Sequence, residues 1–579
     1  MKIIARWCAL AAFAAAALGA TAQAQASTSS SSRPWWKGAV IYEIYPRSFQ
    51  DTDGDGIGDL NGITSRLDYL KSLGVDAIWL TPIYPSPQVD FGYDISNYEA
   101  IDPQYGTMKD FDHLVAEAKK RHIRVIMDLV LNHTSDKHPW FKESESSRNN
   151  PKRDWYIWRD GKGHGQPPNN WQSVFGHSAW QYDAKTKQWY YHKFYIQQPD
   201  LNWRNPAVRK AMYDVERFWI RHGVAGFRLD AITTLFEDPK LHDEGVLRDA
   251  SGKPLINAFG DPRLDDTRTN NLPGVHDVLR KLRSIADSYR GRQIVLIGET
   301  YVSSVADLRK MYGLHNDELQ LPMDLQVGFI NKLDVDLFRR RITEAETGLD
   351  GDEPLLVLDN HDNPRWDRYG DGVHNLDIGR VLATVVLASR GSAMYYYGDE
   401  IGMVTTPPTR KEDVRDPVGI TGWPKEKGRD GERTPMQWTA GPDAGFGSAG
   451  VKTWLPIPPS YTTANVAVES AQPDSLLSWY KELDRLKHVD AALREGRQVM
   501  LNTTDSNVLS WLRQAPDGEA VVVTCNFTKE PQKVSFDLKA LGVAGNSVET
   551  LMMTPGAVAP KSLEGVELPP FGVYIGRVK

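Results

Sequence analysis

The feature that most constrains the fold of this chain is a regular alternation of short apolar runs with helical patterns. Eight apolar runs have the length and composition of buried strands: 39–46, 77–82, 125–133, 224–229, 294–300, 318–326, 355–362 and 394–398. Helical patterns lie between many of these runs, at 63–73, 108–121, 206–222, 275–290 and 378–388. Eight such units predict an α/β fold, the (β/α)8 TIM barrel. A doubly wound open sheet is the rival fold, but no Gly-rich phosphate-binding loop follows the first run.

Three of the apolar runs end in an acidic residue: Asp230, Glu299 or Asp362. Residues i and i+2 of a strand share a face, so we expect Arg228 to keep Asp230 ionised. Glu299 follows an apolar strand and would have negative charges nearby, so we expect it to retain its proton. A structural ion pair would explain one such strand end. Three acids at the C-terminal ends of barrel strands predict an active site.

The rest of the 579-residue chain divides around this barrel, which we expect to span residues 27–490. Residues 134–205 interrupt the alternation with a segment rich in Trp, Asn, Pro and Gly, which predicts a subdomain inserted after the third strand. Residues 402–449 are rich in Pro, Gly and Arg and predict an active-site loop over the barrel mouth after the eighth strand. Short strand-like runs separated by turn residues predict a C-terminal all-β sandwich at 491–579.

Residues 1–26 have the pattern of a signal peptide, with basic residues before an apolar run and small residues after it. The run is short and Ala-rich for a membrane span, so we expect cleavage rather than a signal anchor. The mature protein would be exported, periplasmic or secreted, without membrane attachment. Cys525 would then be its single cysteine, which leaves no intrachain disulfide. The net charge of −7 and the lack of a long basic run argue against nucleic acid as a partner.

Seven short motifs resemble those of one enzyme family. They are DLVLNH at 128–133, GFRLDA at 226–231, GET at 298–300, DNHD at 359–362, GYDIS at 92–96, QPDLN at 198–202 and RTPMQW at 433–438. Their order and spacing are similar to those of the α-amylase family, glycoside hydrolase family 13. The motifs QPDLN and RTPMQW resemble its α-glucosidase and oligo-1,6-glucosidase branch.

The resemblance implies roles for the three acids. Asp230 would be the nucleophile, Glu299 the general acid/base and Asp362 the carboxylate that stabilises the transition state. The chemistry agrees, because a retaining glycosidase needs two carboxyl groups about 5 Å apart, one ionised and one protonated. For Asp128, the sequence favours a structural role and a functional role equally.

The resemblance also implies a set of substrate-binding residues. These are Asp94, His133, Phe175, Arg228, Ala231, His361 and Arg433. Asp94 and Arg433 would close the pocket and favour attack at chain ends, whereas Phe175 would pack on the sugar. For either histidine taken alone, a place in the core is the simpler interpretation.

We therefore expect a retaining exo-acting α-glucosidase that acts on small-molecule α-glucosides. In the α-glucosidase branch, Val after the nucleophile accompanies α-1,6 cleavage and Ala or Thr accompanies α-1,4 cleavage, so Ala231 implies a preference for maltose-type bonds. An oligo-1,6-glucosidase stays open as an alternative, as does a transglycosylating relative such as a sucrose isomerase or trehalose synthase. A non-enzymatic family-13-like binding protein is remote, because such proteins need an anchor and can lose the acids that this chain keeps.

The acidic loop at 51–59 (DTDGDGIGD) predicts a separate metal site. Oxygen ligands at alternate positions suit a hard cation such as Ca²⁺, with glycines permitting the tight turn. The loop is not a full EF-hand, because Gly62 stands where a bidentate Glu should be. The resemblance implies a structural Ca²⁺ held by Asp51, Asp53, Asp55, the Ile57 carbonyl and Asp59, with no organic cofactor. A solvated Asp/Gly turn is the simpler alternative.

Overall fold

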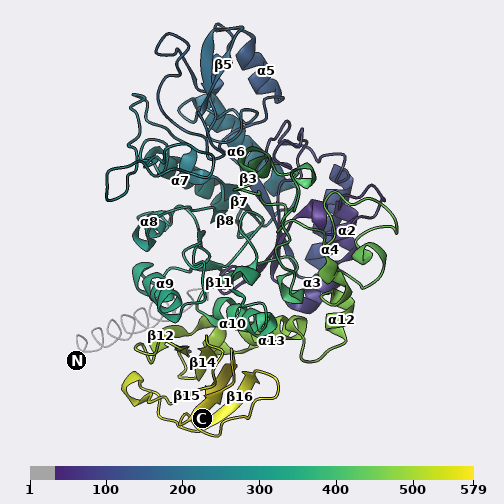
Figure 1. Ribbon diagram of the computed structural model, residues 1–579, viewed down its shortest axis with the longest axis vertical. Coiled ribbons are helices and arrows are strands. Elements are labelled where there is room, and N and C mark those ends of the chain that lie inside the picture. Colours follow the sequence, from purple (N-terminus) through teal and green to yellow (C-terminus); the bar gives the residue numbers. More distant parts are fainter. Residues whose placement is uncertain (1–32) are drawn as a thin grey trace, which may run out of the picture. The chain divides into compact units, whose positions relative to one another are not determined.

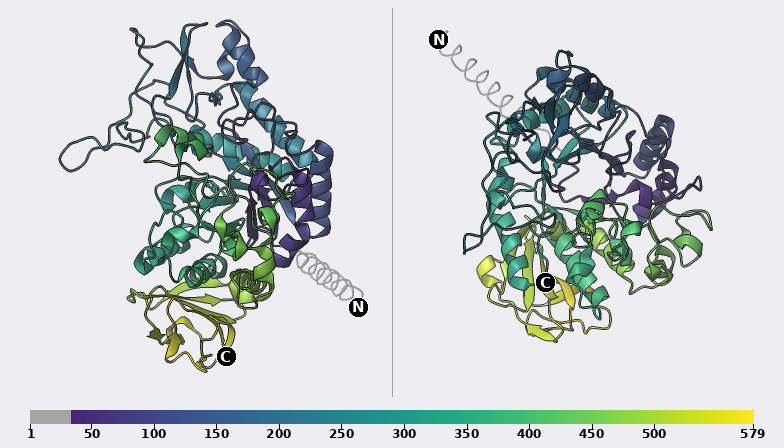
Figure 2. Two further views of the ribbon diagram at one scale, coloured as in Figure 1. Left: turned by 45° about the vertical axis from the view of Figure 1, so that its right-hand side comes forward. Right: turned by 45° about the horizontal axis from the view of Figure 1, so that its top comes forward.

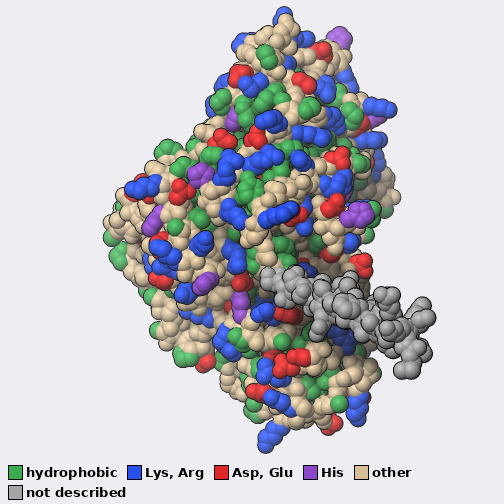
Figure 3. Space-filling model, turned by 180° about the vertical axis from the view of Figure 1, so that it is seen from behind, with side chains coloured by type: hydrophobic (Ala, Val, Ile, Leu, Met, Phe, Trp, Pro, Cys, Tyr) green, Lys and Arg blue, Asp and Glu red, His purple; other side chains and the backbone are tan. Residues whose placement is uncertain are grey.

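The computed structural model of the protein describes residues 33–579, of which residues 38–579 form one compact unit. The predicted signal peptide, residues 1–26, lies outside the described residues. From residue 33 onward, no helix combines the length and the apolar character that crossing a bilayer requires. On the face drawn in Figure 3, hydrophobic side chains are interspersed with basic and acidic ones.

Eight parallel strands close into a barrel at the centre of this unit (Figure 1), which confirms the predicted fold class. In order around the barrel they are β1 (Val40–Ile44), β2 (Ala77–Leu80), β3 (Arg124–Val130), β7 (Gly226–Asp230), β8 (Val295–Gly298), β9 (Leu321–Asp324), β10 (Leu355–Val357) and β11 (Ser392–Tyr396). Nearly every strand residue is buried, as expected for a parallel sheet covered by helices outside and filled by side chains inside. The register places Asp128 beside Arg228 and Leu229 beside Gly298, so polar side chains of β3 and β7 meet Glu299, the residue after β8, at one end.

Helices follow the strands and bury an apolar stripe, except α10 (Asn375–Ala388), which is buried on most of its surface. They are α2 (Leu60–Ser65), α3 (Leu67–Leu73), α4 (Met108–Lys120), α6 (Pro206–Arg221), α7 (Gly274–Ser288), α8 (Val305–Lys310), α9 (Val335–Gly348), α10 (Asn375–Ala388) and α13 (Leu476–Val489). In α6, the Asn205 side chain accepts a hydrogen bond from the Ala207 N–H, which caps the helix start. The predicted helix at 63–73 is divided at Arg66, and α9 had no counterpart in the sequence prediction.

Two long excursions leave the barrel between consecutive strands. The segment 134–205 contains α5 (Pro139–Ser146) and an antiparallel sheet of β4 (Trp158–Arg159), β6 (Gln188–Tyr191) and β5 (Trp180–Asp183). Figure 2 shows this blue segment at the end of the barrel remote from the yellow C-terminal strands. The second excursion, between β7 and α7, is an arm at 245–265 held by isolated bridges such as Val246 with Leu264 and Ile256 with Pro262. The sequence prediction did not include this arm.

The C-terminal strands form a five-stranded sheet and a two-stranded sheet. They are β12 (Arg497–Leu501), β13 (Val508–Gln514), β14 (Ala520–Asn526), β18 (Val573–Val578) and β16 (Val548–Met553), with β15 (Gln532–Val534) and β17 (Val566–Leu568) in the smaller sheet. Alternate residues of β13 divide between two cores: Trp511 packs in the core that also contains the barrel helices, and Leu512 packs in the core between the two sheets. Arg513 is fully buried and donates to the carbonyl of Ala388 at 2.8 Å, where α10 ends.

Candidate active site

The three acids predicted from the sequence line one cavity of about 660 Å³. Asp230 is the last residue of β7, and Glu299 directly follows β8. Asp362 differs from the prediction, because β10 ends at Val357 and leaves this residue in the following loop. The local turn that carries Asp362 is closed by its neighbours, since Asn360 and Asn363 form an isolated bridge.

Arg228 joins the carboxyl groups of three neighbouring strands. Its side chain is fully buried, and its Nη1 donates to Asp230 Oδ1 at 2.6 Å and to Asp128 Oδ2 at 3.1 Å. Its Nη2 donates to Glu299 Oε1. Arg228 therefore contacts Asp230, as the sequence predicted, and two further carboxyl groups as well. It lies behind the cavity and aligns the acids, and it does not line the cavity wall.

One guanidinium therefore faces three carboxyl groups. Burial raises the pKa of Asp230 well above its ordinary value, raises the pKa of Glu299, and raises the pKa of Asp128 to about 7, while Arg228 lowers all three. One positive charge cannot hold three buried carboxylates ionised, so this group retains a proton near neutral pH. Glu299 also accepts the Ala231 N–H at 2.8 Å, which fixes the orientation of its carboxyl.

Asp362 lies between two guanidinium groups. Its Oδ1 accepts from Arg429 Nη1 at 2.7 Å and from Arg433 Nη2 at 2.8 Å. Burial would raise the pKa of this carboxyl, but His361 and the two arginines together outweigh burial and lower it. Asp362 is therefore ionised across the working pH range.

Arg429 and Asp90 form an ion pair at the cavity wall, in the segment where the sequence predicted Asp94 to bind sugar. Arg429 Nη2 donates to Asp90 Oδ1 at 2.9 Å while Nη1 holds Asp362, and both Arg429 and Asp90 line the cavity. Asp94 is fully buried and does not line the cavity. Its carboxyl accepts the backbone N–H groups of Val89 and Asp90, so it shapes the turn that presents Asp90.

The other predicted sugar-binding residues divide into two groups. His133, Phe175 and Ala231 line the cavity, whereas His361 and Arg433 are fully buried behind Asp362 and make no part of its wall. Burial lowers the pKa of His133 to about 3, which keeps its ring neutral. The ring of Phe175 lies 5.4 Å from the Arg429 guanidinium, so a cation–π contact joins the inserted segment to the bridge.

Several cavity residues were not among those predicted. Asp90 and Tyr93 flank or belong to the GYDIS motif, and Arg429 precedes RTPMQW by four positions, so the motifs pointed to the right segments. The arm and its continuation toward α7 contribute a further set: Asn257, Phe259, Arg263, Leu264, Asp266 and Asn270. The signal for this set was the length of chain between β7 and α7, which far exceeds an ordinary βα connection.

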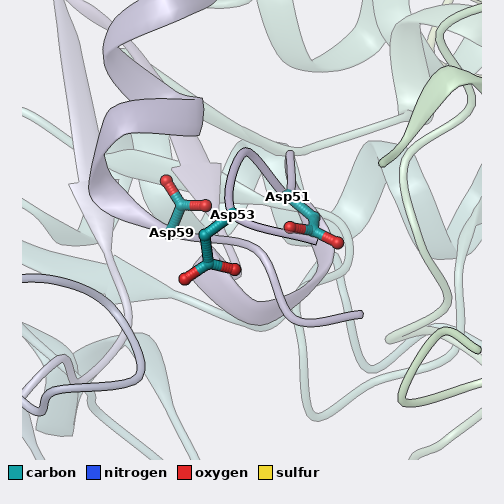
Figure 4. Close-up of side chains that lie close together, drawn as sticks. All are labelled: Asp51, Asp53 and Asp59. Carbon is teal, nitrogen blue, oxygen red and sulfur yellow. The ribbon is translucent and has the colours of Figure 1, made fainter. Parts of the chain in front are cut away.

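The acidic loop brings together three of the four predicted carboxylates. Asp51, Asp53 and Asp59 place carboxylate oxygens within 4.8 Å of one another (Figure 4). Asp55 lies outside this group, and its carboxylate accepts the Ile57 N–H at 2.8 Å. The donor set is all oxygen, and no ion pair of the described residues involves these acids, so the loop fits a hard cation.

Comparison with known proteins agrees with this geometry. The model of the α-amylase catalytic domain matches residues 43–496. A probable α-glucosidase of Rhizobium meliloti is 40% identical over 94% of this chain and 97% of its own length. An oligo-1,6-glucosidase of Parageobacillus thermoglucosidasius is 38% identical over 89% of this chain and 96% of its own. The crystal structure of a trehalulose synthase from Pseudomonas mesoacidophila covers 94% of this chain and 100% of its own, with 35% identity and a TM-score of 0.84.

Three findings agree on one family. The family model spans most of the chain, two relatives match over nearly their whole length, and the barrel has acids at its strand ends. The chain belongs to the α-amylase family, glycoside hydrolase family 13, and is a glycoside hydrolase of its α-glucosidase branch.

Proposed function

We propose that this protein is a retaining, exo-acting α-glucosidase that removes terminal α-linked glucose from short oligosaccharides. The observation that carries the proposal is the attachment of Asp230 and Glu299 to the two Nη atoms of Arg228. Two carboxyl groups on one guanidinium are close neighbours, which suits the spacing of about 5 Å that retention requires and not the wider gap of an inverting enzyme.

In the proposed reaction, the Asp230 carboxylate attacks the anomeric carbon while Glu299 gives its proton to the leaving glycosidic oxygen. Burial raises the pKa of both acids, so the reactive form is the one in which the proton retained around Arg228 sits on Glu299 and Asp230 is the carboxylate. Water then attacks the covalent glycosyl–Asp230 ester, with Glu299 taking back a proton. Asp362, held ionised by Arg429 and Arg433, stabilises the positive charge that develops on the sugar.

The exo mode of attack rests on the bridge between Asp90 and Arg429. This ion pair joins the segment after β2 to the loop after β11, and it lies at the cavity wall beside Asp362. A cavity closed beside the catalytic acids leaves no exit for a continuing chain, so substrate would bind by its end.

A preference for α-1,4 bonds rests on Ala231, which lines the cavity next to the nucleophile. Two alternatives keep support from the relatives: an oligo-1,6-glucosidase, and a transglycosylating enzyme that transfers glucose to a sugar instead of water. These alternatives share the acids and differ in what occupies the leaving-group side of the cavity.

Product analysis tests the proposal. Maltose, isomaltose, sucrose and trehalose are incubated separately with the enzyme, and the products and their initial anomeric form are recorded by NMR. We expect glucose released first as the α-anomer, fastest from maltose, with Asp230→Asn as the inactive control. Initial release of the β-anomer would exclude retention, and a sucrose isomer as the main product would favour the transferase.

We also propose a structural Ca²⁺ at the loop 51–59, with Asp51, Asp53 and Asp59 as its carboxylate ligands. The ion would neutralise acids that have no cationic partner among the described residues, and it would stabilise the loop without entering the chemistry. Export to the periplasm or the medium remains a proposal that rests on the signal-like pattern of residues 1–26.

A further inference from the structure

The imidazole of His361 is fully buried next to the cavity, and each of its nitrogens has its own partners. Nδ1 lies 2.6 Å from Glu43 Oε1, a β1 carboxyl that is itself fully buried. Nε2 lies 2.8 Å from the hydroxyl of Tyr93 and 3.3 Å from Asp362 Oδ2. The ring of Tyr93 stacks on the imidazole at 5.4 Å with an interplanar angle of 9°. The imidazole is therefore fixed in place and shielded from water.

The hydrogen count on this chain determines which nitrogen of His361 carries a hydrogen. Tyr93 has one hydroxyl hydrogen, and it donates that hydrogen to Asp128 Oδ2 at 3.0 Å. Asp362 is an ionised carboxylate that can only accept. When the proton retained around Arg228 sits on Glu299, Asp128 is a carboxylate and accepts the Tyr93 hydrogen. Neither neighbour of Nε2 then has a hydrogen to give, so Nε2 carries one and acts as the donor.

A hydrogen must also lie between Nδ1 and Glu43 Oε1, because two lone pairs 2.6 Å apart repel. It belongs either to a neutral carboxylic acid on Glu43 or to a doubly protonated His361. Burial raises the pKa of Glu43 well above its ordinary value and lowers the pKa of His361 well below its own, so the neutral pair is favoured. Glu43 Oε2 has no hydrogen-bond partner in the described part of the chain, a position that a neutral carboxyl tolerates better than a carboxylate.

We propose that Glu43 is a positioning residue: as a neutral carboxylic acid it donates to Nδ1 of His361, and so fixes the imidazole with its Nε2–H directed at Tyr93 and Asp362. The Tyr93 hydroxyl can then donate its hydrogen to Asp128, whose carboxylate also accepts a hydrogen bond from Arg228. Through His361, a group on β1 would orient both Asp362 and the arginine that holds the two reacting acids.

The charged and titratable groups that face Glu43 are drawn from several barrel strands. They are Arg228, His361, Asp362, Asp128 and Tyr396. Two groups favour the ionised form of Glu43: Arg228, whose charge is shared with three other carboxyl groups, and the backbone N–H of His361, which lies 3.3 Å from Glu43 Oε1. The balance leaves the carboxyl of Glu43 neutral.

Two substitutions separate hydrogen donation from packing. Glu43→Gln keeps the size of the side chain and can donate an amide hydrogen to Nδ1, whereas Glu43→Leu keeps the bulk but cannot donate. We expect kcat for maltose near the wild-type value in the Gln variant, and a loss of about three- to tenfold in the Leu variant, the range of one hydrogen bond. KM should change little, because Asp362 acts mainly in the transition state. Equal kcat for the Leu variant and the wild type would overturn the proposal.

Infrared difference spectroscopy of wild type minus Glu43→Gln at neutral pH reads the protonation state directly. We expect the carbonyl band of a buried, protonated carboxyl group to be lost in the variant. Loss of a carboxylate band in its place would overturn the proposal, even if the Leu variant failed to fold. The kinetic comparison rests on the proposed α-glucosidase activity. The infrared measurement does not depend on turnover, so it tests the protonation of Glu43 even if that proposed function is wrong. Circular dichroism of each variant checks the fold.

Discussion

Replacing Ala231 by Val tests the proposed origin of the linkage preference. Ala231 follows the nucleophile in a left-handed conformation, with φ 46° and ψ 35°, and its N–H donates to Glu299. Its methyl group faces the cavity, where the leaving sugar would lie. The substitution therefore adds bulk beside the leaving group and places a β-branched residue at a strained position.

These two effects have separate magnitudes and separate readouts. Ala231 already bears the roughly 1–2 kcal/mol that a left-handed conformation costs a residue with a Cβ. A β-branched side chain tolerates this conformation least, so the free energy of unfolding should fall further in Ala231→Val. A steric clash of a few atoms costs on the order of 1–3 kcal/mol, which changes relative rates by about ten- to two-hundredfold. Only the second effect depends on the substrate.

The assay is the ratio of kcat/KM for maltose to that for isomaltose, with thermal denaturation recorded in parallel. We expect the ratio to fall at least tenfold in Ala231→Val, and we expect Ala231→Gly to keep the wild-type ratio while relieving the backbone strain. If both constants fell together and left the ratio unchanged, Ala231 would not select the linkage. A wild-type enzyme faster on isomaltose would remove the premise.

Three further predictions concern the nucleophile, the acidic loop and a buried acid. Asp230→Asn should abolish turnover while circular dichroism stays unchanged, because Asn keeps the shape of the side chain but cannot form the covalent intermediate. Chelation should lower the melting temperature, since an ion at a hundred times its Kd stabilises the fold by about 2.7 kcal/mol. Glu216→Gln should raise the melting temperature more at pH 8 than at pH 5. Glu216 on α6 is fully buried, neither of its carboxyl oxygens has a partner among residues 33–579, and burial raises its pKa well above 4.5.

The sign of the last prediction follows from proton binding. Above the unfolded pKa, the folded state keeps a proton that the unfolded state has released, so wild-type stability falls with rising pH by up to about 1.4 kcal/mol per unit. Glu216→Gln does not lose stability with rising pH in this way. The control is Glu99→Gln, the same substitution at an exposed position. If the gain in melting temperature of Glu216→Gln were the same at pH 5 and pH 8, the argument would be contradicted.

For the acidic loop, Asp53→Asn should reduce the rise in melting temperature caused by Ca²⁺. A melting temperature that changes with neither chelator nor Ca²⁺ would reject the metal site. Near-wild-type activity of Asp230→Asn would reject the nucleophile.

The catalytic acids could be found from the sequence because barrel strands are continuous apolar runs and an acid at their end stands out. Asp230 and Glu299 lie where the pattern predicted, and Asp362 lies in the adjoining loop. Asp94 was predicted to bind sugar, but the residue of its segment that lines the cavity with a carboxyl group is Asp90. Alternation along a strand says nothing about a turn, where Asp90 faces the cavity and Asp94 accepts backbone N–H groups instead.

The arm at 245–265 was beyond the sequence pattern for a different reason. It is held by isolated bridges rather than by a ladder, so it lacks both the alternation of a strand and the periodicity of a helix. Helix α9 did carry a signal, because Val335, Phe338, Ile342 and Ala345 are buried at helical spacing. Its many charged residues obscured that stripe.

The shared core between the barrel helices and β13 has a consequence for how this protein can be taken apart. Trp511 and Arg513 belong to the same buried surface as the end of α10, so a cut near residue 490 would expose apolar side chains and leave the Ala388 carbonyl without its guanidinium donor. Such a fragment would aggregate rather than fold as a smaller enzyme. For the same reason, residues 38–579 should melt in a single calorimetric transition, and a C-terminal module borrowed from a relative would work only if it brought a matching face for α10.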